Sequence, residues 1–416
     1  MTVDARRRVV ITGIGAVTPI GMGVDGLWDG ILRNTSGVSE ITSFDTSRHR
    51  TKVAGVVRGF DPAPFVSRKN LKRLDRFAGF AVAAARMAAL DSGIDLSKDP
   101  GAGIVMGSAL GGIGFAEGQH DVFRERGLNR VNPALALLVF GASGSSHIAI
   151  ELGIKGPNLT NSNSCSSGTI AVGEAFEMIR SGRADVLLAG GAEAPLYPLT
   201  FGSFAIIKAM TGRNDDPKGA CRPFDSGRDG FVMGEGSAML VMEEARHAME
   251  RGAKIYAEVL GYGLTNDAFH MTSSRPDGEC ASGAVRTALK QAGIGPEKIG
   301  YVNAHGSSTP MNDRHETEAI KRALGPHAYR VPISGTKPFH GHPLGATGAI
   351  EAAICALAIT NEYLPPTLNL ETPDPACDLD YIPLTGRKAR VDYVLSNSFG
   401  FGGINAALAL GRAVVD

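Results

Sequence analysis

The sequence predicts an α/β fold assembled from two similar halves. Short apolar runs typical of buried strands alternate with helical patterns along the 416 residues, and this alternation favours mainly parallel sheets. The 54 glycines indicate many close turns between these elements. A new series of strands starts near residue 253, after a helix that ends at Gly252. We therefore expect an N-terminal half over residues 1–252 and a C-terminal half over residues 253–416.

The first half shows strands and helices in regular succession. Apolar runs bounded by turn residues predict strands, and apolar residues spaced three or four apart, as in residues 169–180, predict helices. The expected strands cover residues 9–11, 103–106, 157–160, 184–189 and 237–242. The expected helices cover residues 25–33, 67–91, 169–180 and 245–251.

The second half echoes the first through one feature, a turn rich in glycine or serine that opens an alanine-rich helix. The feature occurs at residues 164–170 and again at 341–350, where the helix continues to residue 359. The strands expected in this half cover residues 255–260, 391–395 and 406–410, with shorter ones near residues 301 and 334. A glycine-flanked loop is expected over 397–403. A duplicated unit would bring the two helix starts together near the middle of the molecule.

Composition limits the possible functions. Lys+Arg and Asp+Glu balance at 42 each, so the overall charge indicates neither nucleic-acid binding nor attraction to an anionic membrane. The five cysteines form no CxxC pair, which is typical of a reducing cytoplasm and argues against a zinc module. The apolar run after residues 6–8 breaks at Gly13, so it predicts a buried strand rather than a signal peptide. We expect no membrane span, because no run of about 18 apolar residues is found.

Cys165 stands on a sharp turn between an expected strand and an expected helix. Free backbone N–H groups and the positive end of the helix dipole converge at a helix start, so we expect a lowered thiol pKa and a nucleophilic thiolate. The neighbours Ser164, Ser166 and Gly168 are small enough to let a substrate carbonyl approach. This stretch leaves a second interpretation open, a buried structural cysteine in a tight turn.

Further chemical candidates lie in the second half. His305 follows one expected strand, and Lys337, His340 and His342 follow another. Histidines on loops can polarise an acyl carbonyl, and the glycines of 397–403 leave N–H groups free for an oxyanion hole. The alternatives are structural histidines, or a metal pair at His340 and His342 that no nearby acidic cluster completes. The glycines near residues 13–15 and 111–118 lack the spacing of a dinucleotide site.

Together these segments resemble the thiolase-fold β-ketoacyl-acyl-carrier-protein synthases, most closely the elongating type II enzymes, over essentially the whole chain. The matching motifs are the turn at Cys165 and residues 222–225, 228–232, 234–236, 302–306, 336–337, 341–342 and 397–403. Each motif alone is weak, but their order and spacing make the resemblance specific. It implies an α/β thiolase fold of five layers, αβαβα, built from two duplicated halves.

The resemblance implies a ping-pong decarboxylative condensation. Cys165 would take up the acyl group, His305 and His342 would hydrogen-bond the malonyl carbonyl, and Lys337 would support them. The backbone N–H groups of Cys165 and Phe401 would form the oxyanion hole. Loss of CO₂ from malonyl-acyl-carrier protein would leave a carbanion that attacks the acyl-cysteine. The product would be 3-oxoacyl-acyl-carrier protein in fatty-acid elongation.

The resemblance also implies contacts with substrate and partners. Ser307 and Thr309 match positions that bind the phosphopantetheine arm. Leu110 and Phe204 match acyl-pocket positions, and Phe399 is a further expected substrate-binding residue. An acidic carrier protein is expected to dock on a basic helix start formed by Arg68, Lys69, Lys72, Arg73 and Arg76. We expect a cytoplasmic homodimer with no metal and no resident cofactor, because phosphopantetheine arrives on the carrier protein.

Departures from the usual family pattern keep two alternatives open. Residues 337–340 read Lys-Pro-Phe-His where the family often has Lys-Ser-Met-Thr, and Asn163-Ser164 stands where Thr-Ala is common. A specialised ketosynthase of a polyketide, polyene or lipid-signal pathway is therefore one alternative. A carrier-binding subunit without catalysis is the other. His342 distinguishes the chain from starter-unit enzymes, which have asparagine there, and residues 399–403 lack the cysteine of degradative thiolases.

Overall fold

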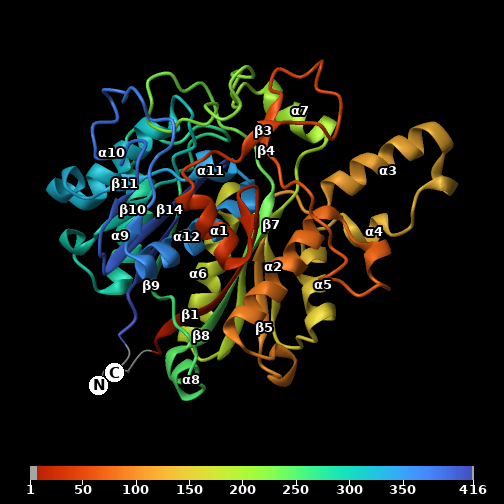
Figure 1. Ribbon diagram of the computed structural model, residues 1–416, viewed down its shortest axis with the longest axis horizontal. Coiled ribbons are helices and arrows are strands. Elements are labelled where there is room, and N and C mark those ends of the chain that lie inside the picture. Colours follow the sequence, from red (N-terminus) through yellow and green to blue (C-terminus); the bar gives the residue numbers. More distant parts are fainter. Residues whose placement is uncertain (1–6, 415–416) are drawn as a thin grey trace.

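The computed structural model describes residues 7–414, which form one 11-stranded mixed sheet, two small two-stranded sheets and the helices that cover them (Figure 1). Its main path has the strand order β11-β10-β14-β15-β9-β1-β8-β7-β5-β6. The N-terminal strands of this path are β1 (Val9–Thr18), β5 (Gly103–Gly107), β6 (Asn158–Asn161), β7 (Val186–Glu193) and β8 (Gly236–Glu244). The C-terminal strands are β9 (Ala257–Asn266), β10 (Tyr301–Asn303), β11 (Ile333–Ser334), β14 (Tyr393–Gly400) and β15 (Ile404–Gly411). The short peripheral strands are β2 (Gly21–Met22), β3 (Val38–Glu40), β4 (Val53–Gly55), β12 (Tyr363–Leu364) and β13 (Arg387–Lys388).

Helices connect these strands along the chain. Those of the first half are α1 (Gly23–Leu32), α2 (Arg76–Ser92), α3 (Ile113–Arg126), α4 (Leu135–Leu138), α5 (Ala142–Leu152), α6 (Ser167–Arg180), α7 (Pro198–Ile206) and α8 (Ala245–Glu250). Those of the second half are α9 (Glu279–Ala292), α10 (Asn312–Leu324), α11 (Lys337–His340) and α12 (Thr347–Asn361).

The two halves repeat one strand pattern. β6, β5 and β7 are parallel neighbours, and β8 and then β1 follow in antiparallel pairing. β11, β10 and β14 are likewise parallel, and β15 and β9 follow in antiparallel pairing. The halves join where β1 pairs with β9, with Val9 opposite Val259. The duplication that the sequence suggested is therefore present, while the boundary between residues 252 and 253 stays a prediction.

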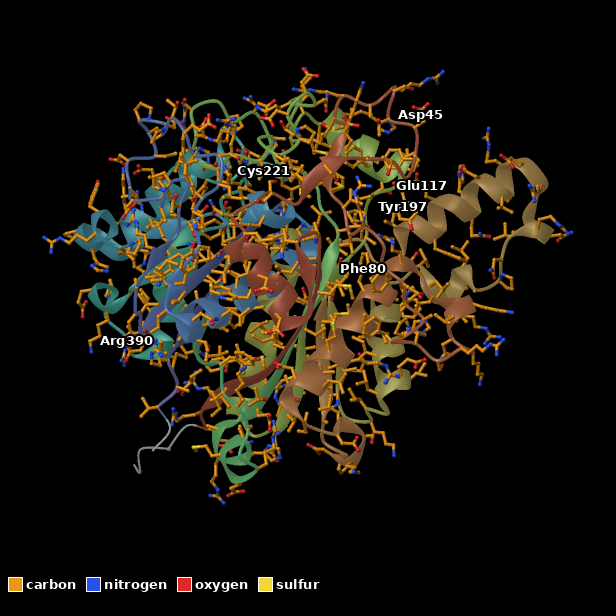
Figure 2. The ribbon with its side chains drawn as sticks, viewed as in Figure 1. Asp45, Phe80, Glu117, Tyr197, Cys221 and Arg390 are labelled. Carbon is orange, nitrogen blue, oxygen red and sulfur yellow. The ribbon has the colours of Figure 1, made fainter. Side chains whose placement is uncertain are left out.

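Three apolar cores define the layers of the fold. α2 and α5 cover the N-terminal strands, with Phe80 of α2 fully buried (Figure 2), and α9 and α10 cover the C-terminal strands. Between them α6 and α12 pack against each other in the central core. Alternate residues of β7 serve two cores, since Leu187 belongs to the central core and Leu188 to the outer one. This arrangement confirms the predicted αβαβα fold class.

The central helix α12 has an unusual composition for a helix of a globular protein. The segment Leu344–Asn361 is long and apolar enough to cross a membrane, contrary to the expectation that the chain has no such segment. In the structure 89% of this segment is buried inside the protein, because α12 lies in the middle layer with all its faces covered. Burial in the core therefore accounts for its apolar character.

One predicted helix begins later than expected. The helix expected over residues 67–91 starts only at Arg76, and Leu71–Arg73 before it form a 3₁₀ turn. Asp75 caps the true helix start, since its carboxylate accepts a hydrogen bond from the Phe77 N–H at 3.0 Å. The prediction that basic residues lie on the start of this helix is therefore wrong for residues 68–73, which precede it and end in the 3₁₀ turn.

The loop expected over residues 397–403 is also shorter than predicted. β14 continues to Gly400 and β15 starts at Ile404, so only residues 401–403 form the turn. Gly402 and Gly403 have φ angles of +83° and +71°, left-handed conformations that favour glycine. The sequence analysis did not predict α3, a largely polar helix that projects from the body in Figure 1.

Candidate active site

Cys165 lies on a strand–turn–helix elbow, as the sequence predicted. β6 ends at Asn161, the 3₁₀ turn Ser164–Ser166 follows, and α6 begins at Ser167. Ser164 has a φ of +51°, a left-handed conformation that non-glycine residues rarely adopt. The Ser167 hydroxyl holds the bend, because it donates to the Ser164 carbonyl at 2.7 Å and accepts from the Asn163 N–H at 2.8 Å.

A second elbow lies against the first. His342 precedes the 3₁₀ turn Leu344–Ala346, which opens α12, and Leu344 has a φ of +35°. The helices approach so closely that a Cβ on Gly168 would lie 2.7 Å from the Ala349 nitrogen. The two helix starts therefore meet at the centre of the molecule, as the duplication led us to expect.

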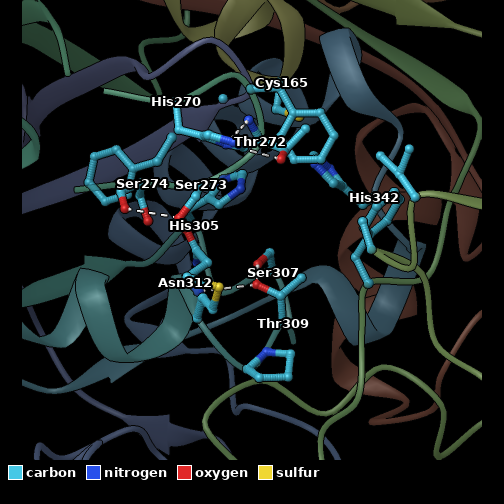
Figure 3. Close-up of a pocket in the computed structure, with 18 of the residues that line it drawn as sticks. Cys165, His270, Thr272, Ser273, Ser274, His305, Ser307, Thr309, Asn312 and His342 are labelled. Carbon is cyan, nitrogen blue, oxygen red and sulfur yellow. Dashed lines mark hydrogen bonds between the residues drawn. The ribbon is translucent and has the colours of Figure 1, made fainter. Parts of the chain in front are cut away.

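Cys165, His305 and His342 line one cavity of about 480 Å³ (Figure 3). The centroids of the two imidazole rings lie 5.3 Å apart, with an angle of 82° between the rings. The cavity reaches the surface beside Ile207 and Met311, which are 50% and 52% exposed. Its lining also includes Lys208, Ser307, Thr309, Phe399 and Phe401. The fold thus brings the predicted nucleophile from one half together with both predicted imidazoles from the other.

Both imidazoles are held in the neutral form. Burial lowers the pKa of His305 and of His342 well below the usual value, and the Lys337 ammonium lowers both further. Nδ1 of His342 lies 2.8 Å from the Thr347 hydroxyl. When this hydroxyl donates to Nδ1, the ring hydrogen resides on Nε2. His342 can then offer a neutral N–H to an oxygen atom that gains negative charge in the cavity.

Lys337 supports His305 from behind the cavity. Its fully buried ammonium donates to the His305 carbonyl and pairs with the Glu351 carboxylate at 2.8 Å. Glu316 holds the same segment, since its carboxylate accepts from the N–H groups of His305 at 2.7 Å and Gly306 at 2.8 Å. Burial raises the pKa of Glu316 and of Glu351 to about 7. These contacts fix the His305 backbone from both sides.

The expectation of a lowered thiol pKa is wrong. Burial raises the pKa of the Cys165 thiol to about 11, and this effect outweighs the N–H groups of Phe401 and Cys165, which lower it. Cys165 is 7% exposed, so the thiolate loses more stabilisation from water than it gains from these N–H groups. The same two N–H groups are the pair expected to form the oxyanion hole, and both are close enough to act on the sulfur.

The raised pKa predicts a distinct pH profile for alkylation. We expect the iodoacetamide reaction of Cys165 in the resting protein to accelerate with pH up to about 11, because only the thiolate reacts. Mass spectrometry of the peptide that contains Cys165, after timed alkylation from pH 6 to 10, measures the rate. A rate that levels off near pH 7 would contradict the raised pKa.

The predicted acyl-pocket residues lie beside the cavity rather than in its lining. Leu110 and Phe204 pack in an apolar cluster that also contains Cys165. The Phe204 ring stacks on the Phe401 ring, with centroids 6.4 Å apart and an interplanar angle of 14°. The apolar cluster adjoins the cavity, because Cys165, Phe231 and Leu344 belong to the cluster and also line the cavity. Ser307 and Thr309 lie in the cavity, and their hydroxyl oxygens are 3.0 Å apart.

Comparison with known protein families accounts for this arrangement. The model for the N-terminal domain of β-ketoacyl synthases matches residues 6–248, and the model for the C-terminal domain matches residues 256–371. The chain belongs to the β-ketoacyl synthase family. This finding confirms the resemblance that the sequence motifs indicated.

Curated relatives match this β-ketoacyl synthase over nearly its whole length. The protein named 3-oxoacyl-[acyl-carrier-protein] synthase 2 from Synechocystis is 46% identical, over 97% of this chain and 98% of its own. The protein of the same name from Coxiella burnetii is 44% identical, over 98% and 99% of the two chains. The Staphylococcus aureus protein of that name is 42% identical over 97% of each chain.

Solved structures of similar fold come partly from polyketide synthesis. The ishigamide ketosynthase/chain length factor superposes with a TM-score of 0.92 at 36% identity and covers 99% of this chain and 100% of that one. A type II polyketide ketosynthase in complex with its acyl-carrier protein, AntDE:AntF, gives a TM-score of 0.89 at 36% identity, with 98% and 100% covered. A β-ketoacyl synthase from Burkholderia phymatum gives 0.92 at 35% identity, with the same coverage.

Four of the five basic residues of the predicted docking patch are exposed, and the fifth is not part of the patch. Arg68, Lys69, Lys72 and Arg73 all have exposed side chains. Arg76, grouped with them from the sequence, instead pairs with the buried carboxylate of Glu235 at 2.7 Å. Arg76 therefore serves the internal packing of this synthase, and the four remaining side chains form the basic surface.

Sequence reasoning missed several buried polar groups around the site. These are Glu193, Glu316, Thr347 and Glu351. A signal was present for Glu351, because a lone carboxylate in an apolar helix is too costly to bury without a partner. The partners that would reveal the role of such a group come from distant parts of the chain.

His340, the third imidazole near the motif, does not line the cavity. It is fully buried, and neither ring nitrogen has a hydrogen-bond partner among residues 7–414. Burial lowers its pKa to about 3, so it is neutral. Within the same described residues, no group of three or more His, Cys, Asp or Glu side chains is placed to hold a metal ion.

Proposed function

We propose that this synthase condenses a Cys165-bound acyl group with malonyl-acyl-carrier protein, with loss of CO₂, to give 3-oxoacyl-acyl-carrier protein in fatty-acid elongation. One observation carries the proposal. A single cavity contains a cysteine on a helix elbow and two neutral imidazoles, which suit acyl transfer and stabilisation of an enolate. The names of relatives at 42–46% identity support elongation.

The first half-reaction transfers the acyl group. The Cys165 sulfur attacks the thioester carbonyl, the phosphopantetheine sulfur leaves, and the thiol proton passes to this leaving sulfur. The N–H groups of Cys165 and Phe401 stabilise the oxyanion of the tetrahedral intermediate. Because the resting thiol has a raised pKa, its proton must leave as the carbon–sulfur bond forms.

The second half-reaction makes the carbon–carbon bond. The malonyl thioester carbonyl accepts hydrogen bonds from Nε2–H of His305 and His342, and the carboxyl group leaves as CO₂. The resulting enolate attacks the acyl carbonyl on Cys165, and the cysteine sulfur is released and takes up a proton. Preorganised donors of this kind contribute roughly 3–4 kcal/mol each to such a step.

A panel of acyl-carrier primers tests the proposed function. Purified protein is incubated with each primer and malonyl-carrier protein, and the products are measured by mass spectrometry. Straight-chain 3-oxoacyl products two carbons longer than the primer support fatty-acid elongation. Repeated extension without reduction supports the polyketide alternative, which the 36% identical polyketide ketosynthases favour. Carrier binding without any acyl transfer supports the non-catalytic alternative.

We also propose that the exposed basic residues dock the acidic carrier protein. The double reversal Lys69→Glu with Arg73→Glu is expected to raise KM for carrier-bound substrate about fivefold to tenfold, because exposed charges steer association. The shift should shrink as salt is added. Lys290→Glu on α9 is the matched control, since Lys290 is exposed in the other half of the protein. A fall in kcat with no change in KM would contradict the proposed role of these residues in docking the carrier protein.

We propose that the synthase is a homodimer formed through the edge strand β6. Leu159 on β6 is 51% exposed. Leu137 and Phe140, which shortly precede the helix α5 that contacts β6, are 63% and 46% exposed. Unpaired edges with apolar side chains favour pairing with another strand. Light scattering should give twice the monomer mass, and Leu159→Asp should give monomer. A wild-type monomer at micromolar concentration would contradict the proposal.

We further propose a cytoplasmic location and activity without a resident cofactor. All five cysteines are free, which suits a reducing compartment. Cell fractionation tests the location. Activity of protein treated with a chelator and desalted, supplied only with carrier thioesters, tests the absence of a cofactor.

A further inference from the structure

Glu193 stands at the end of β7, directly behind the active site, and is fully buried. Its carboxylate accepts four hydrogen bonds. Oε1 accepts from the Ser108 hydroxyl at 3.2 Å and the Leu110 N–H at 3.1 Å. Oε2 accepts from the Ala109 N–H at 2.6 Å and the Gly345 N–H at 3.0 Å.

The hydrogen-bond pattern favours the ionised carboxylate, against burial, which raises the pKa of Glu193 to about 7. Three of its partners are backbone N–H groups, which can only donate. The fourth, the Ser108 hydroxyl, accepts from the Gly111 N–H at 3.0 Å and keeps its own hydrogen to donate to Glu193. A proton on Oε2 would have no acceptor, because both partners of that oxygen are backbone N–H groups. Four donors therefore stabilise a buried negative charge.

These donors come from two segments with different tasks. Residues 108–111 carry Leu110, which packs in the apolar cluster beside Cys165. Gly345 belongs to the turn that follows His342 and opens α12. The segments touch at Glu193, since a Cβ on Gly345 would lie 2.4 Å from the Ala109 nitrogen and 2.7 Å from Oε2 of Glu193.

We infer that Glu193 is a positioning residue that clamps the segment of the acyl-pocket residue Leu110 to the turn that follows His342. The inference rests on the proposed roles of Cys165 and His342. One carboxylate thereby sets both the shape of the apolar cluster and the direction of the imidazole. Neither His305 nor the Cys165 turn hydrogen-bonds to Glu193. The Glu193 charge acts on Cys165 only by raising the pKa of its thiol, so loss of that charge is not expected to slow the first half-reaction.

The substitution Glu193→Gln tests the clamp with almost no change in volume. The amide NH₂ group replaces one oxygen and then faces N–H donors instead of accepting from them. We expect malonyl decarboxylation by the acylated enzyme to fall about 10²-fold, because a displacement near 1 Å suffices for such a loss. Transfer of a short acyl group to Cys165 should change little, and the range of primer lengths accepted should broaden.

Two further variants separate positioning from stability. Gly345→Ala disturbs the same junction from the other side. If both changes act through one junction, the double variant Glu193→Gln with Gly345→Ala should be no less active in malonyl decarboxylation than the less active of the two single variants. Glu243→Gln is the control, because Glu243 is also a fully buried carboxylate of the same sheet but pairs with Arg251 away from the cavity. Glu243→Gln should lower the thermal stability without changing the ratio of the rates of the two half-reactions. If Glu193→Gln fails to fold, Gly345→Ala carries the test alone.

His342→Ala distinguishes failure of the clamp from failure of the proposed function. If His342→Ala retains malonyl decarboxylation, the proposed role of His342 is wrong. A second outcome is that His342→Ala loses malonyl decarboxylation while Glu193→Gln and Gly345→Ala behave like the wild type, both in the ratio of the rates of the two half-reactions and in the primer lengths accepted. In that case the clamp is wrong and the proposed function stands. An equal fall of both half-reactions in Glu193→Gln also overturns the clamp.

Discussion

The substitution Cys165→Ala is expected to lower condensation about 10⁴-fold or more, because it removes the one thiol among the residues that line the cavity. Labelled acyl-carrier protein should leave no label on the variant after denaturation. The fold should persist, since the change removes one sulfur atom from a turn held by its serine hydroxyls. We expect a loss of about 1 kcal/mol in the free energy of unfolding.

The matched control is Cys377→Ala, which removes another buried free thiol, from the outer core of the C-terminal half. This variant should keep acyl labelling and condensation at wild-type rates. Acyl label that remains on Cys165→Ala, or that disappears from Cys377→Ala, would show that the nucleophile is a different residue.

The substitution Lys337→Ala is expected to destabilise the protein by about 3–5 kcal/mol at pH 8, because it leaves the buried Glu351 carboxylate without its partner. It also removes the donor to the His305 carbonyl, so the rate of malonyl decarboxylation should fall as well. Urea unfolding followed by circular dichroism measures the first effect. Release of labelled CO₂ measures the second.

The pH dependence of this variant identifies the cause. Burial raises the pKa of Glu351 in the folded protein to about 7 from the usual 4.5, and Lys337 opposes this rise. A raised folded pKa means that stability is lost as pH increases from 4.5 to the folded pKa. In the wild type this loss levels off above pH 7. In Lys337→Ala the pKa lies higher, so unfolding free energy should keep falling by about 1.4 kcal/mol per pH unit.

The double variant Lys337→Ala with Glu351→Gln supplies the control. It retains a polar group of the same size but has no carboxylate to ionise, so its stability should be nearly independent of pH between 7 and 9. If Lys337→Ala alone is already independent of pH in that range, the buried carboxylate is not the source of the instability.

Local chemistry was readable from the residues around Cys165. Small residues between an apolar run and a helical pattern predicted the elbow, and the structure has it at Ser164–Ser166. The start of α2 was misplaced by nine residues, from 67 to 76, because the cap at Asp75 depends on where its carboxylate turns. The sequence predicts a loop over residues 397–403, but glycines are compatible with either a loop or the end of a strand, and β14 continues to Gly400.

The sequence by itself determined the alternation of elements, the duplication and the residue types that carry the chemistry, because these depend on local pattern and motif order. Only the tertiary structure decided the electrostatics. The thiol of Cys165 has a raised pKa, against the local expectation, since desolvation depends on every segment that covers the sulfur. The pairing of Lys337 with Glu351 and the junction at Glu193 likewise join groups far apart in the chain. Burial and charge act through space, so their balance is set only when the two halves have packed together.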